Sequence, residues 1–517
     1  MNNPLAAGDL YLLAPEISLV LLACAVILVD LFVKKRIVTA TVALVGLIVP
    51  IAFTLSQAFT LTGTHHAFYD MLVIDGYAIF FEIIFLIIAV VMVVASYSYL
   101  GKYIRAEGEF YALLLFSVTG MMLMASTSEL ISLYISLELT SFPLYVMAGL
   151  LRTSEKSAEA SVKYVLLGAM SSAILLYGFA LLYGLTGTTD MASIAAVIKS
   201  GLHTGHVITA LQGNIMELVA GVLILAGFGF KISAVPFHMW APDIYEGAPT
   251  PATAFFSVGS KAAGFAALIR VFIDAGLGQV NLSSLVIIVA VVAILTMTLG
   301  NFVAAVQTNV KRMMAYSSIA QAGYILVGFA ASLAGGTSDG NSAVLFFILV
   351  YVLTNLGAFS GIIALANATG GERIDDFKGL AKRAPLLSAG TALCLLSLGG
   401  LPPLAGAISK IFIFLAALGQ GEALYAHGQG LTGGFLIALV VIALINSIVS
   451  LVYYGRIVKV MYFDAPLKDE RVVTPLTLSA SIALMTAAVV VLTFVAGVIL
   501  TLTSPAASSL LAFLAGR

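Results

Sequence analysis

Residues 385–418 read PLLSAGTALCLLSLGGLPPLAGAISKIFIFLAAL, an apolar stretch interrupted at its centre by Gly399-Gly400-Leu401-Pro402-Pro403. At about 1.5 Å per residue, an unbroken helix of this length would span about 51 Å, whereas bilayer hydrocarbon is ~30 Å thick. The two prolines lack the amide hydrogen that a helix requires, so the helix must break there. Lys410 lies two turns beyond this point. The stretch therefore predicts a membrane helix in two halves, with a basic group beside the break.

The rest of the chain has the composition of a membrane protein. Of its 517 residues 61% are hydrophobic and 9% are charged, and the mean hydropathy is +1.10. Soluble domains carry about 25% charged residues and disordered chains are poor in apolar ones, so both classes are excluded. The net charge of -1 gives no basic field for a nucleic-acid partner. The two cysteines, Cys24 and Cys394, offer no metal-ligand spacing, so we expect no metal in this chain.

Fourteen stretches are apolar and long enough to cross a membrane as helices, which takes about 20 residues each. Their apolar runs are continuous and do not alternate every second residue, so membrane-spanning strands are not expected. The chain is therefore predicted to be an all-α polytopic membrane protein. The predicted spans are residues 12–32, 37–61, 77–100, 110–126, 130–151, 162–185, 218–240, 252–272, 285–306, 313–333, 344–366, 385–418, 435–454 and 475–502.

The basic residues predict the orientation of these spans. With the N-terminus outside, most of the 24 Lys and Arg fall in loops or at span ends on the inner side, where membrane proteins concentrate positive charge. We therefore expect both termini on the periplasmic side or its equivalent. The inner-side residues include Lys34, Arg105, Lys163, Lys311 and Arg312.

Four ionisable residues lie deep inside the predicted spans: Glu138, Lys231, Lys261 and Lys410. Each costs about 2.5–3.5 kcal/mol on insertion scales, so the four together cost about 10–14 kcal/mol. One acid cannot neutralise three lysines, so we expect some lysines to be neutral part of the time and to exchange protons. The alternative is a set of structural ion pairs that lock helices together.

Other polar residues are expected to serve simpler roles. Arg270 lies one turn from the end of its span, from which its side chain could reach the interface. The acids Glu16, Asp30 and Glu82 lie near span ends, where solvated or interfacial positions are expected. His238 follows the seventh span and is expected to be a structural hydrogen-bonding group, although histidine can titrate near neutrality.

A second interrupted helix is predicted at the seventh span. Gly227 and Gly229 precede Lys231, and Pro236 follows it. Two interrupted helices, each with a buried lysine beside the break, are typical of transporters built from internal repeats. Broken backbone is tolerated in a membrane where it is buried or lines water, so each break predicts a half-channel. The alternative is a proline kink that serves packing only.

The two breaks also predict the organisation of the chain. Because spans seven and twelve are an odd number apart, they enter the membrane from opposite sides, so the repeat must be inverted. The predicted units are an N-terminal three-helix segment (1–105), a first five-helix repeat of spans 4–8 (106–275), a second, inverted five-helix repeat of spans 9–13 (280–460), and a C-terminal segment with span 14 (461–517).

Three stretches identify a family resemblance. Residues 230–251, FKISAVPFHMWAPDIYEGAPTP, resemble the antiporter-like subunits of proton-pumping NADH:quinone oxidoreductase, respiratory complex I. Residues 257–265, SVGSKAAGF, and residues 312–324, RMMAYSSIAQAGY, resemble subunit N in particular. Two further features resemble subunit N more than its relatives. Subunit M has a glutamate where this chain has Lys410, and subunit L continues beyond span 14, whereas this chain ends soon after it. Gln321 departs from the pattern, since many members have a histidine there.

The resemblance implies roles for individual residues. Glu138 would pair with Lys231 at the membrane centre, Lys261 would link the inner half-path to the central axis, and Lys410 would serve the half-path to the periplasm. Moving an acid away from a lysine makes the lysine eject its proton. Auxiliary positions are Lys163, His238, Tyr316 and Gln321.

The function implied by the resemblance is proton translocation in a redox-driven NAD(P)H (or ferredoxin):quinone oxidoreductase of the cell membrane, or of the thylakoid membrane in a photosynthetic relative. The chain itself would do no redox chemistry. Flavin, iron–sulfur clusters and quinone would belong to partner subunits, which are other membrane subunits and a peripheral redox arm, with lipids around them. Two alternatives stay open: a cation/proton antiporter subunit of a multi-subunit sodium/proton exchanger, and a structural spacer with inert ion pairs.

Overall fold

The computed structural model describes residues 7–33, 35–104, 106–200, 210–277, 282–335, 338–466 and 471–515, so Lys34 and Arg105 lie outside the described residues. The first half of the chain forms helices α1 (Ala7–Leu12), α2 (Ala14–Phe32), α3 (Arg36–Gly46), α4 (Ile48–Thr60), α5 (Gly76–Tyr103), α6 (Glu107–Ser126), α7 (Leu130–Ala148), α8 (Glu155–Thr186), α9 (Met191–Lys199), α10 (Ala210–Ile232), α11 (Trp240–Gly247), α12 (Thr250–Phe255) and α13 (Lys261–Asp274). A π-helical turn, η1 (Phe256–Ser260), joins the last two.

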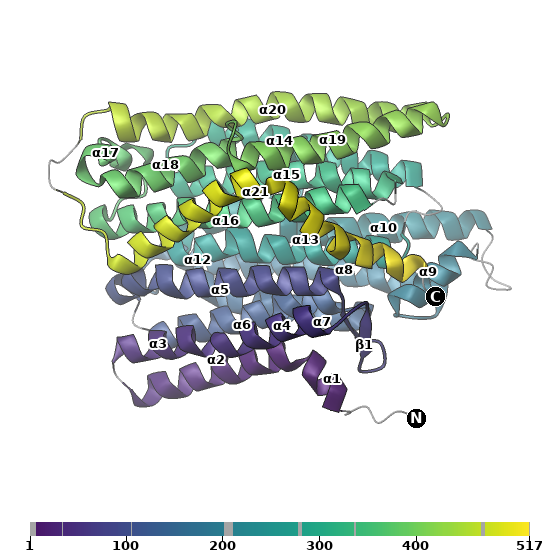
Figure 1. The fold of residues 1–517 in the computed structure, drawn as a ribbon, viewed down its shortest axis with the longest axis horizontal. Helices are drawn as coiled ribbons and strands as arrows, with labels where there is room; N and C mark the ends of the chain where they lie inside the picture. Colours follow the sequence, from purple (N-terminus) through teal and green to yellow (C-terminus); the bar gives the residue numbers. More distant parts are fainter. Residues whose placement is uncertain are drawn as a thin grey trace.

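The second half forms α14 (Leu282–Val306), α15 (Val310–Gly335), α16 (Ser338–Thr369), α17 (Leu380–Arg383), α18 (Pro385–Gly399), α19 (Ala405–Ala426), α20 (Gly430–Phe463) and α21 (Leu476–Ala515), with a 3₁₀ turn, η2 (Ile374–Phe377). The long helices lie side by side, with α2 and α3 along one edge of the bundle and α20 along the other (Figure 1). The last helix, α21, crosses obliquely over α5 and α16 (Figure 1).

Within the described ranges, fourteen helical segments are long and apolar enough to cross a membrane. They correspond one to one with the predicted spans, so the predicted count and order are confirmed. The twelfth span consists of α18 and α19 and continues to Ala426, beyond the predicted end at Leu418. The only strands in the described part of the chain are a short antiparallel pair outside the spans, β1 (His65–Ala67) and β2 (Leu72–Ile74).

Local side chains fix several helix ends. Asp75 caps α5, because its carboxylate accepts a hydrogen bond of 2.8 Å from the Ala78 amide. Glu129 caps α7 in the same way, with a distance of 2.6 Å to the Ser132 amide. Such caps satisfy amides that the helix leaves without a carbonyl partner. At the C-terminus of α8, Gly187 has φ +74°, a left-handed conformation that glycine adopts at little cost.

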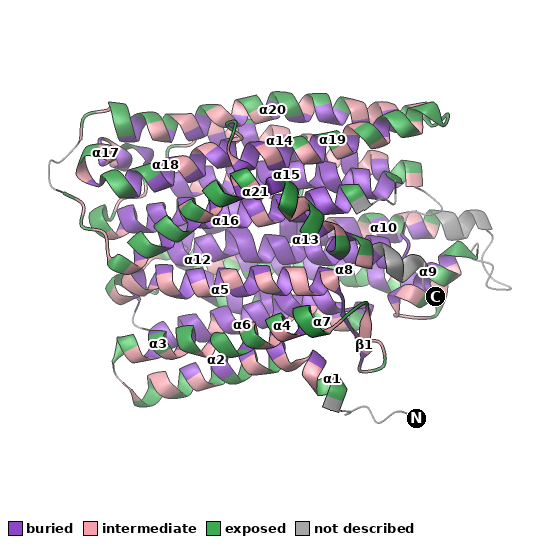
Figure 2. Ribbon diagram, in the orientation of Figure 1, coloured by how far each residue is buried: buried purple, intermediate pink, exposed green. Residues whose placement is uncertain are grey.

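Burial follows the layers of the bundle. The central helices α12, α13, α15 and α16 are almost entirely buried, whereas α2, α8, α20 and α21 expose one face (Figure 2). The exposed faces are apolar, with Leu21, Leu31, Phe32 and Phe494 among their side chains. An apolar outer surface around fourteen spans is what lipid or a neighbouring membrane subunit requires. The chain is therefore a multi-pass helical membrane protein.

Candidate functional site

The first predicted break lies between α10 and α11. Helix α10 ends at Ile232, Ser233 takes a left-handed conformation with φ +60°, and α11 begins at Trp240. The Trp240 indole donates a hydrogen bond of 2.8 Å to the carbonyl of Phe230, and the Tyr164 ring stacks on it at 4.8 Å. These contacts fix the two half-helices against each other, so the break has one defined geometry.

Lys231 lies in the last turn of α10 and is 4% exposed. Its ammonium donates to the Ser141 hydroxyl on α7 at 2.7 Å, and a cavity of about 10 Å³ adjoins it. Glu138, one turn before Ser141, accepts a hydrogen bond from Ser172 of α8 and acts on Lys231 electrostatically. Among the described residues these two charged groups form no direct ion pair; Ser141, which accepts from Lys231, and Ser172, which donates to Glu138, line the same cavity.

Lys261 follows the π-helical turn and is buried. Its ammonium donates to the Ser318 carbonyl on α15 at 2.6 Å. The Ser318 hydroxyl shares a hydrogen bond of 2.9 Å with the Tyr351 hydroxyl on α16, which donates to the Ser257 carbonyl in the π turn at 2.8 Å. Polar groups of α13, α15 and α16 are thus joined in the most buried part of the bundle.

The second break lies between α18 and α19. Helix α18 ends at Gly399, and Gly400 has φ +83°. The Lys410 ammonium, on α19, donates to the Gly399 carbonyl at 3.1 Å and to the Ser447 and Ser450 hydroxyls of α20 at 3.2 and 3.5 Å. The carbonyls at a helix C-terminus carry partial negative charge, so the end of α18 stabilises a cation in the bilayer.

Tyr351 connects the surroundings of Lys261 and Lys410. Besides its bond to Ser318, it lines a cavity of about 10 Å³ next to Lys410, together with Gln321 and Thr354. A cavity of this size admits about one water molecule. The two lysines therefore lie at the ends of one polar connection through α15 and α16.

The auxiliary positions separate into different groups. Gln321 donates to the Leu398 carbonyl at 2.9 Å and to the Tyr454 hydroxyl at 3.4 Å, at the end of α18. His238 is buried in the first break, and its Nδ1 has no hydrogen-bond partner among the described residues. Tyr316 is half-buried against the core. Lys163 lies where α8 meets α11, and it lines a different cavity from those beside Lys231 and Lys410.

Apart from Lys163, the residues of a charged cluster between α8, α11 and α15 were not predicted as a site. Asp243 binds Lys163 at 2.7 Å and Arg312 at 2.9 Å, and Glu246 binds Lys156 at 2.7 Å and Arg312 at 3.1 Å. These five residues line a cavity of about 190 Å³. The sequence signal was available, since two acids stand in the stretch 230–251 while basic residues begin α8 and α15.

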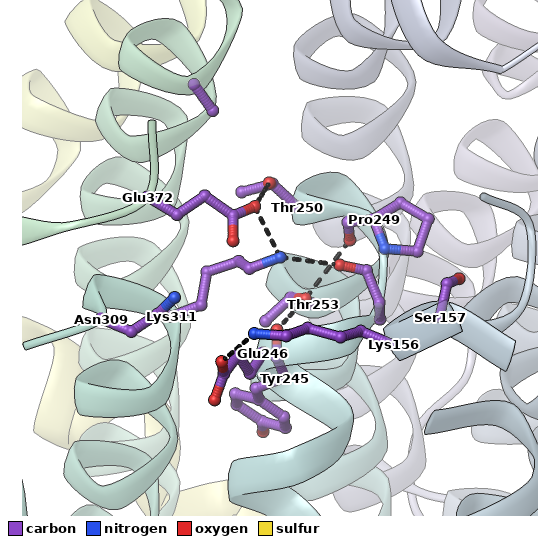
Figure 3. Close-up of polar contacts among 12 residues, drawn as sticks. Lys156, Ser157, Tyr245, Glu246, Pro249, Thr250, Thr253, Asn309, Lys311 and Glu372 are labelled. Atoms are coloured by element: carbon purple, nitrogen blue, oxygen red, sulfur yellow. Dashed lines mark hydrogen bonds and ion pairs between the residues drawn. The ribbon is translucent and has the colours of Figure 1, made fainter. Parts of the chain in front are cut away.

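Lys311 also has a partner that the sequence did not indicate. It is 1% exposed, and its ammonium contacts the Glu372 carboxylate at 2.7 Å and the Ala248 carbonyl at 2.9 Å. Figure 3 shows the Lys311 side chain extended between Glu372 and the turn before Pro249, with Thr250 donating to the same carboxylate. This ion pair joins the start of α15 to the α11–α12 turn.

The charged cluster gives a pH prediction. Partial burial raises the pKa of Asp243, but hydrogen bonds from Lys163 and Arg312 outweigh it, so this pKa lies below its ordinary value. A lowered pKa stabilises the folded state above the ordinary range of the group, and that contribution disappears as pH falls through the folded-state value. We expect Asp243→Asn to lower the apparent melting temperature slightly at neutral pH, because the carboxylate is partly solvated.

The difference between wild type and Asp243→Asn should persist down to about pH 4, where the unperturbed carboxyl protonates, and shrink as the pH falls further through the lowered pKa of the folded state. Thermal unfolding of the purified protein at a series of pH values measures it. Glu109→Gln is the matched control, since Glu109 makes only an exposed contact of 3.8 Å with Arg152. A difference that grows on acidification would contradict the assignment.

Two expectations about polar residues were wrong. Arg270 does not reach the interface: it is 1% exposed and contacts the carboxylates of Asp75 at 3.0 Å and Asp274 at 3.1 Å. Because these acids neutralise it internally, the side chain has no need of water. Glu16 and Glu82 are not solvated either, with exposures of 2% and 0%; helix α4 packs against both α2, which carries Glu16, and α5, which carries Glu82.

Comparison with known proteins places this geometry in a family. The family model for the transmembrane region of NADH:quinone oxidoreductase and Mrp antiporters matches residues 127–436, which include both breaks, the half-buried Glu138 and the three buried lysines Lys231, Lys261 and Lys410. NADH-quinone oxidoreductase subunit N of Desulfitobacterium hafniense is 41% identical over 469 residues, covering 88% of this chain and 89% of that protein.

Two solved structures have the same fold. A chain of respiratory complex I from Thermus thermophilus is 30% identical with a TM-score of 0.73, covering 94% of this chain and 98% of that one. A chain of the Mrp complex from Dietzia sp. is 21% identical with a TM-score of 0.82, covering 96% and 97%. An array of fourteen helices with two interrupted spans defines the class of antiporter-like membrane proteins. This chain belongs to the NADH:quinone oxidoreductase/Mrp antiporter transmembrane family.

Proposed function

We propose that this chain is an N-type, proton-translocating subunit of a redox-driven quinone oxidoreductase in the cell membrane. The 41% identity to a subunit N supports the type of subunit. The observation that carries the transport role is the chemistry around the buried lysines. Among the described residues, Lys231, Lys261 and Lys410 donate hydrogen bonds only to neutral oxygens, and the Lys410 ammonium also lies 4.6 Å from the centre of the Tyr324 ring.

The other buried basic side chains have a different environment from these three lysines. Arg270 and Lys311 are held by carboxylates, as structural ion pairs are. An ammonium bound only by hydroxyls and carbonyls has no full counter-charge, so burial favours its neutral form and it can pass a proton on. The two kinds of environment separate the proposed proton carriers from groups that hold helices together.

The proposed path runs from Lys231 through Lys261 to Lys410, with Ser318 and Tyr351 between the last two. Glu138 acts on Lys231 through the field of its charge. Residues 106–275 and 280–460 form two inverted five-helix units, each with one interrupted helix as its half-channel, and both termini face the periplasm. Quinone reduction, with its flavin and iron–sulfur clusters, takes place in partner subunits of the membrane and peripheral arms.

The test of this function is purification of the complex through a tag on this chain. We expect quinone-reducing hydrophilic subunits to co-purify and quinone reduction to drive proton uptake into inside-out vesicles. Recovery of antiporter subunits only, with sodium/proton exchange and no quinone reduction, would favour the exchanger alternative, whose fold the Mrp chain shares.

Glu138→Gln is expected to reduce coupled pumping several-fold, because the amide still accepts the Ser172 hydrogen bond but no longer carries the charge that acts on Lys231. Glu138→Asp should be milder. Pumping is measured by fluorescence quenching in inside-out vesicles and normalised to assembled complex. Glu109→Gln, at an exposed site, is the control, and equal pumping in Glu138→Gln and wild type would remove Glu138 from the mechanism.

Tyr351→Phe is expected to slow pumping without blocking assembly, since it removes the hydroxyl that joins Ser318 to the Lys410 cavity. The phenyl ring keeps the packing of α16. The same vesicle assay measures the effect, with Tyr425→Phe, at an exposed ring, as the control. An unchanged rate would show that protons do not use this hydroxyl.

A further inference from the structure

Two buried acids lie outside the lysine path, in the N-terminal helices. Glu16 is on α2 and Glu82 is on α5, and helix α4 packs against both of these helices. Figure 1 shows α2 at the edge of the bundle, with α4 between α2 and α5. Neither acid belongs to an interrupted helix or to the charged cluster at α11.

Helix α4 brings the two acids to one place. The Thr54 hydroxyl donates to Glu82 Oε2 at 3.2 Å. One turn further on α4, Gln57 donates to the carbonyls of Tyr11 and Leu12, at 2.8 and 3.1 Å, and Glu16 stands one turn after Leu12. The two carboxyl groups also interact electrostatically with each other.

The surroundings of Glu16 and Glu82 contain more hydrogen-bond acceptors than donors. Both carboxyl oxygens of Glu16, Oε1 of Glu82 and Oε1 of Gln57 are buried and accept no hydrogen bond from the described residues. Among the side chains that the structure describes, only the Thr54 hydroxyl donates to either acid. Buried oxygens without donors are rare because each loses its interaction with water.

Neighbouring charges do not supply a counter-ion. Helix α4 contributes only the neutral Thr54 and Gln57, and the one further charge that acts on Glu82 is Asp75, whose carboxylate is taken by Arg270. On another side, Thr54 lines a cavity of about 200 Å³ whose other walls are apolar side chains of α4, α5 and α21, including Leu86 and Leu484. Two ionised carboxylates facing each other in such surroundings repel and lack solvation.

We infer that Glu16 and Glu82 form a proton-binding pair, in which one carboxyl group is protonated and the other ionised, at a site separate from the three lysines. The bound proton supplies the donor that the oxygens lack, and it removes one of the two like charges. The pair therefore holds one proton at neutral pH and exchanges it reversibly. This inference does not rest on the proposed path, because it concerns helices outside both interrupted spans.

The test is infrared difference spectroscopy of the complex purified through this chain, recorded between two pH values in H₂O and in D₂O. We expect wild type to show a deuterium-sensitive carboxylic-acid carbonyl band that is missing from the double variant Glu16→Gln/Glu82→Gln. Each single variant should keep one such band at a shifted frequency, because one acid remains buried without its partner. The single variants keep the test valid where the double variant fails to assemble.

Glu155→Gln is the matched control: Glu155 is exposed, so its removal should leave every acid band in place. The inference is overturned if the double variant retains all wild-type acid bands. It is also overturned if Glu16 and Glu82 contribute only carboxylate bands that respond to added sodium at constant pH, which would make the pocket a cation site. Quinone-coupled proton pumping is measured separately. A result that contradicts the proposed lysine path can therefore be distinguished from one that contradicts proton binding by Glu16 and Glu82.

Discussion

Quinone-coupled proton pumping is expected to fall below about a tenth of the wild-type rate when Lys410 is replaced by alanine, a loss that corresponds to at least about 1.4 kcal/mol in the barrier. Alanine removes the only ammonium that contacts the end of α18 and the Ser447 and Ser450 hydroxyls. No other basic side chain of the described residues lines the cavity next to Lys410. A proton arriving through Tyr351 would then have no site to occupy.

The assay for Lys410→Ala is proton uptake by inside-out vesicles, with quinone reduction and assembled complex measured in parallel. Lys410→Arg should be less damaging than alanine, because the guanidinium can donate to the same oxygens, although it does not release a proton. Lys378→Ala is the control, since this lysine lies in a partly exposed i,i+3 pair with Asp375. Normal pumping in Lys410→Ala would show that the second break is structural.

Lys231→Ala is expected to cause a loss of similar size, by a different route. The substitution removes the donor to Ser141 and leaves Glu138 with no cation on which to act. Coupling between the acid and the path would be lost even where the break keeps its shape, which the Trp240–Phe230 contact maintains. Lys261→Ala should also impair pumping.

Comparison of Lys231→Ala with Ser141→Ala distinguishes two roles: Lys231 carries the proton, whereas Ser141 only positions the Lys231 side chain. Both are measured in the vesicle assay at several pH values. Ser141→Ala should retain pumping with an altered pH profile, because the lysine stays but loses its hydrogen bond. If Lys231→Ala pumps as wild type does, the lysine is a packing element and the proposed path begins elsewhere.

The interrupted helices could be predicted from the sequence because their cause is local. Two prolines at 402–403 and one at Pro236 prevent regular helix wherever the chain folds. The spans and the depth of Lys231 and Lys410 follow from hydropathy in the same way. The boundaries of the two inverted repeats stay a prediction.

The partners of buried charges could not be predicted, because they come from distant parts of the chain. Arg270 was expected to reach water, yet its acid Asp75 lies 195 residues earlier. Lys311 was counted as an inner-loop charge, whereas Glu372 holds it in the interior. Hydropathy reports how deep a residue lies within a span, but only packing decides whether an opposite charge or a hydroxyl faces it.

The oxygen that binds Lys410 at the end of α18 belongs to the main chain, so no point substitution deletes it. A scan of single mutations would therefore identify Lys410 but not the Gly399 carbonyl that accepts its hydrogen bond. Shortening or lengthening the loop at 400–404 would instead slide the helix end past α19 and change how firmly the cation is held. The length of this loop therefore affects the proton affinity of Lys410 independently of which amino acids the loop contains.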